Sequence, residues 1–158
     1  MPEIRLETFI KAPVERCFDL SRSIDLHEVS LEHTGEKAID GKTSGLIEKG
    51  ESVTWQARHF GIKQRLSVKI TEMNAPQYFC DEMTEGAFKN MRHEHFFETR
   101  ETGTLMIDKF CYEAPFWIFG AFFDYFVLKN YMKRLLERRN QTIKRIAEGE
   151  EWKKLIKR

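Results

Sequence analysis

The chain has 158 residues, enough for one domain whose hydrophobic core needs no disulfide or structural metal to hold it together. Lys and Arg number 26 and Asp and Glu number 25, so the whole molecule presents no strong field to a polyanion, and we expect no nucleic-acid partner. The three cysteines, Cys17, Cys80 and Cys111, show neither CxxC spacing nor an even-numbered disulfide framework. Because the N-terminal residues also do not resemble a secretory signal, a reducing cytoplasm is the expected location.

The N-terminal segment predicts one strand followed by two short helices. Residues 3–11 alternate between apolar and polar side chains, the pattern of a half-buried strand. Pro13 ends this strand and suits the first turn of a helix, and residues 14–21 then show apolar side chains at helical spacing. Ser23 is an expected N-cap for a second helix that extends to Val29.

The middle of the chain predicts a series of antiparallel strands. Residues 51–59 and residues 62–70 both alternate, and Phe60-Gly61 between them has the length of a two-residue hairpin turn. This turn brings both apolar faces to the same side of the sheet, which supports the register. The predicted pairs are His59 with Ile62, Ala57 with Gln64 and Trp55 with Leu66. Further strands are expected over residues 37–40, 77–83, 89–99 and 104–112, with turns at 74–76, 84–86 and 101–103.

The C-terminal part predicts one long helix over residues 115–148. Its first half, residues 115–128, is apolar on nearly every side, and a helix of that kind must be enclosed by protein or lipid. We expect the preceding strands to enclose it, in a single domain of residues 1–148. Residues 149–158 form a charged, frayed tail, with Trp152, Leu155 and Ile156 as expected docking points.

Several stretches carry a resemblance to a known superfamily. They are LETFIKAPVERCFDL (residues 6–20), TWQARHFG (residues 54–61), residues 88–97 and residues 106–108. These resemble the helix-grip START/polyketide cyclase-like (SRPBCC) superfamily, which includes START lipid-transfer domains and the major birch pollen allergen, and more narrowly its small bacterial ligand-binding members. The resemblance implies an α+β fold, in which a curved antiparallel sheet of about seven strands wraps around a long C-terminal helix, with an internal apolar pocket. It implies no single activity, because one fold hosts many functions.

Strand alternation predicts a polar cluster on the inner face of this sheet, made of His59, Gln64, Asp81, His93, His95 and Asp108. The turn at residues 101–103 allows two registers. A Glu101-Thr102 loop sets His95 opposite Asp108, whereas a Thr102-Gly103 loop sets Phe97 opposite Asp108 and His93 opposite Tyr112. In either register a histidine lies within reach of the carboxylate, because opposed Cβ atoms are roughly 4.5–5.5 Å apart and diagonal ones roughly 7–8 Å apart.

Three interpretations of the cluster stay open. It consists of buried polar groups that satisfy one another and orient a ligand, or it performs general acid–base catalysis through His93, His95 and Asp108, as in cyclase or dehydratase relatives. Covalent catalysis is disfavoured, since no Ser or Cys nucleophile has an adjacent base. Third, His93-x-His95 with His59 and Asp81 has the ligand types of a zinc or iron site. HxH alone is a weak signal and the resembling superfamily rarely uses metal, so no metal site and no cofactor is predicted.

The sequence therefore predicts that a small apolar or amphipathic molecule binds between sheet and helix, in a carrier or a sensor. The alternative is a cyclase/dehydratase-like enzyme in the same cavity. The second short helix and the loops at residues 41–45 and 84–86 would gate access. The expected apolar walls are Trp55, Leu66, Val68, Phe79, Met83, Met91, Phe97, Met106, Phe110, Tyr112, Phe119, Phe122, Phe123 and Phe126.

Two further expectations concern the surface. His27 and His33 are expected to face solvent, although His27 would reach the pocket mouth if the second helix acts as a lid. Residues 115–128 are fewer than the roughly 20 that a spanning helix needs, and Asp124 interrupts them, so no transmembrane segment is predicted. Because basic residues follow from Lys129 onward, peripheral contact with a membrane surface remains an alternative.

Overall fold

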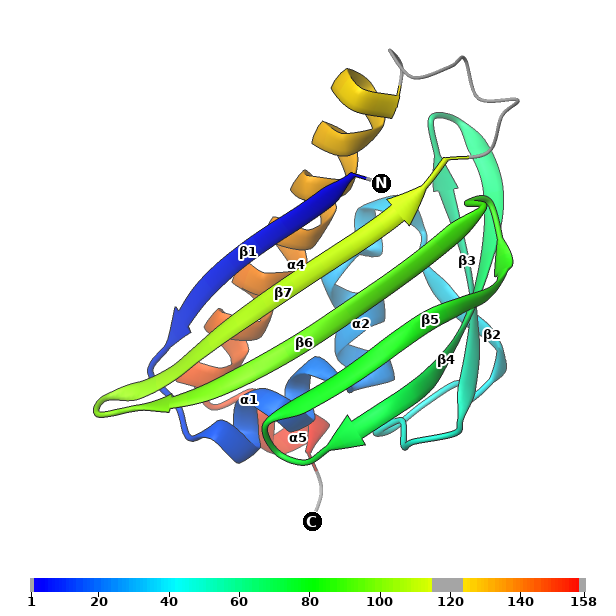
Figure 1. The fold of residues 1–158 in the computed structure, drawn as a ribbon. Coiled ribbons are helices and arrows are strands. Elements are labelled where there is room, and N and C mark those ends of the chain that lie inside the picture. The colour runs from blue at the N-terminus through cyan, green and yellow to red at the C-terminus, as the bar shows by residue number, and fades with distance from the viewer. Residues whose placement is uncertain (1, 115–123, 157–158) are drawn as a thin grey trace.

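The computed structural model describes residues 2–114 and 124–156, which form a seven-stranded antiparallel sheet with helices on one side (Figure 1). The strand order is β1-β7-β6-β5-β4-β3-β2, so the first strand pairs with the last and every other neighbour in the sheet is also a neighbour in the sequence. The strands are β1 (Glu3–Ile10), β2 (Lys37–Gly41), β3 (Ser52–His59), β4 (Ile62–Asn74), β5 (Tyr78–Gly86), β6 (Asn90–Arg100) and β7 (Gly103–Glu113).

The helices follow the predicted order. They are α1 (Val14–Ser21), α2 (Ile24–Ser30), the 3-10 turn η1 (Glu32–Thr34), the π-helical turn η2 (Asp124–Leu128), α4 (Lys129–Glu148) and α5 (Trp152–Leu155). Ser23 caps α2 as expected, because its hydroxyl accepts a hydrogen bond from the backbone N–H of Leu26 at 3.1 Å. The predicted helix over residues 115–148 is observed from Asp124 onward, and residues 115–123 lie outside the described residues.

The β3–β4 hairpin has the predicted register, with Trp55 opposite Leu66 and His59 opposite Ile62. Phe60 and Gly61 have φ angles of 53° and 75°, as a two-residue turn with two left-handed positions requires. The β6–β7 hairpin uses the first of the two open registers, in which His95 lies opposite Asp108.

One predicted turn is wrong. Residues 84–86 have turn-like composition, yet they extend β5, and Gly86 pairs with Leu66 of β4. β4 is 13 residues long and pairs with Glu85 and Gly86, with a register shift at Thr84, so strand pairing overrides local composition.

The helix α4 packs against β1, α1 and α2 through one apolar face, and Figure 1 shows it behind the plane of β1 and β7. Residues of that face include Leu136, Ile143, Ile146 and Ala147, all of which are buried in the core. Within the residues described, no helix is both long enough and apolar enough to cross a membrane.

The C-terminal tail docks through the residues that the sequence indicated. α5 places the Trp152 ring 3.9 Å from the guanidinium carbon of Arg16 on α1, and Ile156 is buried beside it. The expectation of a frayed tail is therefore wrong for these residues, since cation–π stacking and apolar burial hold them.

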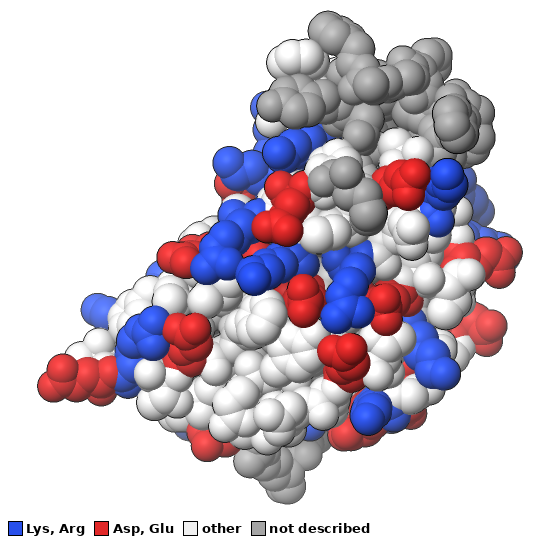
Figure 2. Space-filling view, viewed as in Figure 1, with Lys and Arg blue, Asp and Glu red and all other residues white. Residues whose placement is uncertain are grey.

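The outer face of the sheet carries charges of both signs in alternation (Figure 2). Arg92 of β6, for example, pairs with Glu94 on the same strand, with Glu82 on β5 and with Glu72 on β4. This face therefore presents no field of a single sign, in agreement with the balanced composition.

We expect the packing of α4 to account for a large part of the stability. Ile143 has no exposed surface, so Ile143→Ala should lower the free energy of unfolding by about 2–5 kcal/mol through lost burial and a residual cavity. The exposed Gln141 on the same helix is the control, and Gln141→Ala should change stability by less than about 0.5 kcal/mol. Urea denaturation measures both, and equal effects would contradict this account of the packing.

Candidate functional site

A cavity of about 140 Å³ lies between the inner face of the sheet and the helices α2 and α4. Its walls are mostly apolar, and the polar groups comprise a cluster on β5 and β6 and further side chains on α1, α2, β3, α4 and the segments between them. The apolar lining comprises Ile24, Leu31, Ile47, Val53, Trp55, Leu66, Val68, Ile70, Phe79, Met91, Phe110, Met132, Leu135 and Leu136. The polar lining comprises Ser21, Arg22, Ser23, His27, Glu36, His59, Asp81, His93, His95 and Arg139.

A buried carboxylate, Asp108 of β7, lies behind the part of the cavity wall that His93 and His95 form. It has no exposed surface and does not line the cavity itself. Oδ1 accepts a hydrogen bond from Nε2 of His93 at 2.8 Å, and Oδ2 accepts one from Nδ2 of Asn140 at 2.7 Å. Nη1 of Arg139 lies 3.5 Å from Oδ1. Burial alone would raise the pKa of this carboxyl group, but the hydrogen bonds and the guanidinium hold the pKa well below its usual range.

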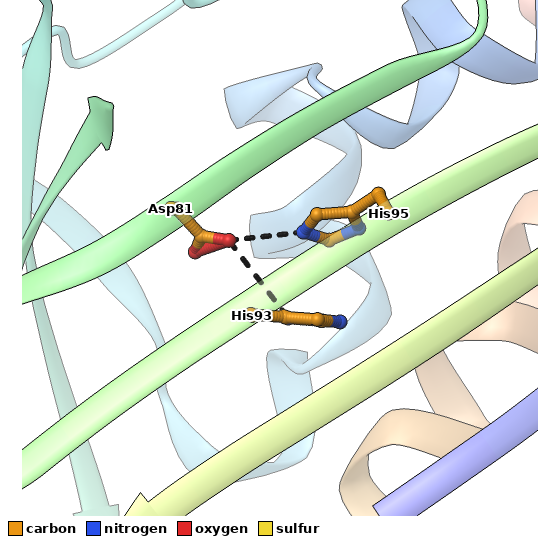
Figure 3. A group of neighbouring side chains, drawn as sticks. All are labelled: Asp81, His93 and His95. Carbon is orange, nitrogen blue, oxygen red and sulfur yellow. Dashed lines mark hydrogen bonds and ion pairs between the residues drawn. The ribbon is translucent and has the colours of Figure 1, made fainter. Parts of the chain in front are cut away.

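A second carboxylate, Asp81 of β5, lies at the cavity surface beside both histidines (Figure 3). Nε2 of His95 is 2.9 Å from Oδ1 of Asp81, and Nδ1 of His93 is 3.9 Å from the same oxygen. Burial would raise the pKa of Asp81, and the hydrogen bond from His95 lowers it. The two imidazole rings face each other with centroids 3.7 Å apart.

The contacts run diagonally across the ladder. His93 lies opposite Asp81 but hydrogen-bonds Asp108, whereas His95 lies opposite Asp108 but hydrogen-bonds Asp81. Diagonal neighbours on one face are within reach of side chains of this length. Each histidine is therefore held between two carboxylates.

His93 is neutral near pH 7 and has a defined tautomer. Burial, followed by the neighbouring His95 ring, lowers the pKa of His93 to about 4. Because ionised Asp108 can only accept, the ring hydrogen of His93 sits on Nε2. Nδ1 then presents a lone pair toward Asp81 and the cavity.

His59 and His27 lie elsewhere in the cavity wall. Nδ1 of His59 is 2.6 Å from the hydroxyl of Tyr131 on α4, so the predicted grouping of His59 with Asp81, His93 and His95 is not formed. His27 stacks on Trp55 with ring centroids 4.1 Å apart, and its Nε2 is 3.3 Å from Oε1 of Glu36. The expectation that His27 faces solvent is therefore wrong, because α2 turns this residue inward; His33 is exposed, as expected.

A second cavity of about 480 Å³ adjoins the first near the β3–β4 hairpin. The two share Trp55, His59, Leu66 and Met132, which therefore form the boundary between them. We call them the inner and the outer cavity. Among the described residues, the outer cavity is also lined by Ala57, Phe60, Ile62, Lys63, Gln64, Arg65, Ala87, Phe88, Leu128 and Tyr131.

The structure distributes the predicted site residues among several environments. In the walls of the inner cavity are Trp55, His59, Leu66, Val68, Phe79, Asp81, Met91, His93, His95 and Phe110, and Gln64 lines the outer cavity. Phe97, Met106 and Tyr112 are buried in the core outside both linings, and Met83 packs against that core. Phe126 is 52% exposed rather than inward-facing, while Phe119, Phe122 and Phe123 lie outside the described residues.

Sequence reasoning missed the helical half of the site. Arg139 lies one turn from Leu135 and from Ile143, so an arginine interrupts the apolar stripe of α4 at helical spacing. It is 4% exposed, and its Nη2 donates to the carbonyl oxygen of Ser21 at 3.1 Å. A charged residue within an apolar stripe was the available signal for a buried polar partner.

This architecture, a curved antiparallel sheet around a long C-terminal helix, is the helix-grip fold, which confirms at the level of the fold the resemblance seen in the sequence. No model of a known protein family matches the sequence, and no curated protein does either. Solved structures, in contrast, match over nearly the whole chain.

Three of these structures illustrate the match. TTHA0849 from Thermus thermophilus has a TM-score of 0.71 and 22% identity, covering 90% of this chain and 97% of that one. Ginseng major latex-like protein 151 from Panax ginseng has a TM-score of 0.68 and 15% identity, with coverage of 94% and 98%. CV1439 from Chromobacterium violaceum has a TM-score of 0.68 and 14% identity, with coverage of 95% and 100%. At these identities the likeness establishes the fold alone.

The lowered pKa of His93 makes the stability pH-dependent. The unfolded ring titrates near the ordinary pKa of 6.5 and the folded ring near about 4, so between these values the unfolded chain binds a proton that the folded protein does not. The contribution of His93 is therefore fully present above pH 6.5 and is lost as the pH falls toward 4, with a magnitude on the order of 3 kcal/mol.

His93→Gln keeps a donor for Asp108 and removes this titration. We expect the free energy of unfolding of the variant to depend less steeply on pH than that of the wild type. The two slopes should differ by up to about 1.4 kcal/mol per pH unit across this window. Urea denaturation at a series of pH values checks this, and parallel stability curves for the two proteins would contradict it.

Proposed function

We propose that this protein binds a small apolar or amphipathic molecule between its sheet and α4, as a carrier or a sensor. The observation that carries the proposal is the adjoining pair of cavities between the sheet and the helices, of about 140 and 480 Å³, with the polar cluster of Asp81, His93 and His95 in the largely apolar wall of the inner one. Ligand sites in proteins are typically apolar concavities with a few polar groups that fix the orientation. Burial of the apolar part would supply affinity at roughly 25 cal/mol per Å².

The inner cavity favours a ligand whose polar end donates hydrogen bonds. Nδ1 of His93 offers a lone pair and Asp81 offers carboxylate oxygens, so both present acceptors to the cavity. Arg139 also lines this cavity, but Ser21 and Asn140 already accept hydrogen bonds from its guanidinium. A hydroxyl or amino group is therefore the complementary ligand end, and the apolar remainder would extend past Trp55 and Leu66 into the outer cavity.

The outer cavity is the entrance in this proposal. Phe60 and Ile62 in its wall are 50% and 62% exposed, so apolar side chains reach the surface there, where a ligand would arrive from water or from a membrane surface. At the other end of the grip, the N–H of Ile24 donates to the carbonyl oxygen of Gly45, and the N–H of Gly45 donates to Asp25. These bonds tie α2 to the 41–45 loop, so we expect the two to move together if they gate access.

A cytoplasmic location accompanies this proposal. Cys17, Cys80 and Cys111 are all free thiols in the structure. An odd set of unpaired thiols fits a reducing compartment.

Filling the boundary between the cavities should impair binding. Leu66 borders both cavities, so Leu66→Trp is expected to lower the affinity for the apolar probe 1-anilinonaphthalene-8-sulfonate at least ~10-fold by occupying its space. Leu105→Trp adds the same bulk on β7 outside either cavity lining and should leave the affinity unchanged. Fluorescence titration measures both variants.

Native mass spectrometry of protein purified from its own host is the companion experiment, and it should reveal a bound small molecule. Equal probe affinity in the two tryptophan variants, together with no co-purified molecule, would refute ligand binding in this space.

The His93–Asp108 pair favours a second candidate function, a cyclase/dehydratase-like enzyme without a covalent intermediate. The carboxylate fixes His93 with its lone pair toward the cavity, an arrangement suited to removing a proton next to a carbonyl group and returning it to a departing hydroxyl. Its pKa of about 4 makes His93 a weak base at neutral pH, which places this candidate after ligand binding.

His93→Gln also tests this second candidate, because the glutamine amide can still donate to Asp108 but offers no basic nitrogen. On a polyketide-like β-hydroxy thioester we expect the dehydration rate to fall by roughly 100-fold or more, with the fold retained by circular dichroism. His33→Gln, on an exposed ring outside both cavity linings, is the control. A rate unchanged by His93→Gln would remove the enzymatic role of this pair.

A further inference from the structure

Three polar side chains in the wall of the inner cavity place atoms that can bind a metal ion close to one another. They are Asp81, His93 and His95, and one ligand atom from each lies within 4.8 Å of the other two (Figure 3). The histidines are 5% and 3% exposed, and all three residues line the cavity. Two imidazoles and one carboxylate are a common donor set for first-row transition metals.

The contact between His93 and Asp81 brings two acceptors together. Because Nε2 of His93 donates to Asp108, Nδ1 carries only a lone pair, and it faces Oδ1 of Asp81 at 3.9 Å with no hydrogen between them. This separation is too long for a hydrogen bond. It suits two ligands of one ion, since metal–ligand bonds of about 2.0–2.2 Å place neighbouring donor atoms roughly 3–4 Å apart.

His95 provides an independent observation. Its buried Nδ1 has no hydrogen-bond partner among the described residues and lies 3.4 Å from Oδ1 of Asp108. While Nε2 donates to Asp81, Nδ1 carries a lone pair 3.4 Å from a carboxylate oxygen, and this proximity of two acceptors is unfavourable. If Nε2 instead ligates a metal ion, the ring hydrogen moves to Nδ1, and the carboxylate oxygen 3.4 Å away then attracts an N–H group in place of a lone pair.

The negative charges of the cluster outnumber its permanent positive charge, so a bound cation would balance them. Asp81 and Asp108 contribute two negative charges, and both of their pKa values are lowered. Arg139 supplies one permanent positive charge, and it is closest to Asp108, at 3.5 Å. A further positive charge beside Asp81 would offset the second carboxylate, and buried charges are normally paired or bound to a metal.

We propose that Oδ1 of Asp81, Nδ1 of His93 and Nε2 of His95 bind a divalent first-row transition ion of the zinc and iron class. Asp108 orients the His93 imidazole through a hydrogen bond to its other ring nitrogen, as outer carboxylates do in many metal sites, and lies 3.4 Å from that of His95. The remaining coordination positions face the inner cavity, where water or a donor atom of a ligand can occupy them. This inference uses the cluster alone and does not depend on the proposed organic ligand.

Metal titration of chelator-treated protein, with no organic ligand present, tests the site. We expect calorimetry to show one Zn²⁺ bound per chain, and Co²⁺ to give visible absorption bands of a nitrogen- and oxygen-ligated ion. Asp81→Asn and His95→Gln should weaken Zn²⁺ binding by about 100-fold or more, and Asp108→Asn by about 10- to 100-fold. His59→Gln is the matched control, because His59 lines the same cavity but is bonded to Tyr131, and it should bind as the wild type does.

A second measurement avoids variants that fail to fold. In ¹⁵N-labelled wild-type protein, Zn²⁺ should shift the ring-nitrogen resonances of His93 and His95 and leave those of His27, His33 and His59 in place. Three results would each overturn the proposal: no stoichiometric Zn²⁺ uptake, unchanged Zn²⁺ affinity in folded Asp81→Asn, or resonance shifts confined to the other histidines. If no Zn²⁺ is taken up, a proton rather than a metal ion balances the charge of the second carboxylate.

Discussion

A carboxylate without exposed surface, Asp108, is held where β6, β7 and α4 meet. Such a group is tolerated only when hydrogen bonds and a counter-charge replace the water that it has lost. His93 supplies one hydrogen bond from the sheet, Asn140 supplies another from the helix, and Arg139 of the helix supplies the counter-charge. The requirement to satisfy Asp108 therefore fixes the rotation of α4 relative to the sheet more narrowly than non-directional apolar packing would.

This fixed rotation also determines which side chains reach the inner cavity. With Arg139 turned toward Asp108, Leu135 and Leu136 come to the cavity wall on either side of it, and the apolar stripe of α4 continues through Ile143 into the core. The cluster of Asp81, His93 and His95 consequently lies among largely apolar walls, which divides the cavity surface into polar and apolar parts. An amphipathic ligand and a metal ion would use the same division, since both need polar donors within an otherwise dry surface.

The sequence predicts the strand half of the site well and the helical half poorly. Period-two alternation places Asp81, His93 and His95 on one face whatever the details of the turns, so their convergence could be expected. Their diagonal pairing could not, because it depends on rotamers and sheet twist that alternation does not contain. The contribution of Arg139 depends on which helical stripe faces the sheet, and the inward turn of His27 depends on how α2 docks, both of which are tertiary properties.

The composition of the cluster is itself an argument for function. A buried ionic network is seldom more stabilising than well-packed apolar residues of the same volume. Stability alone therefore does not explain why two carboxylates, two histidines and an arginine lie together beside the inner cavity. Coupling of the helix to the sheet explains Asp108, Asn140 and Arg139, each of which is bonded across that interface. It does not explain Asp81 and His95, which contact each other within the sheet and face the cavity. These two residues hold polar atoms at the cavity surface, at a cost in desolvation that a bound ligand or metal ion would offset.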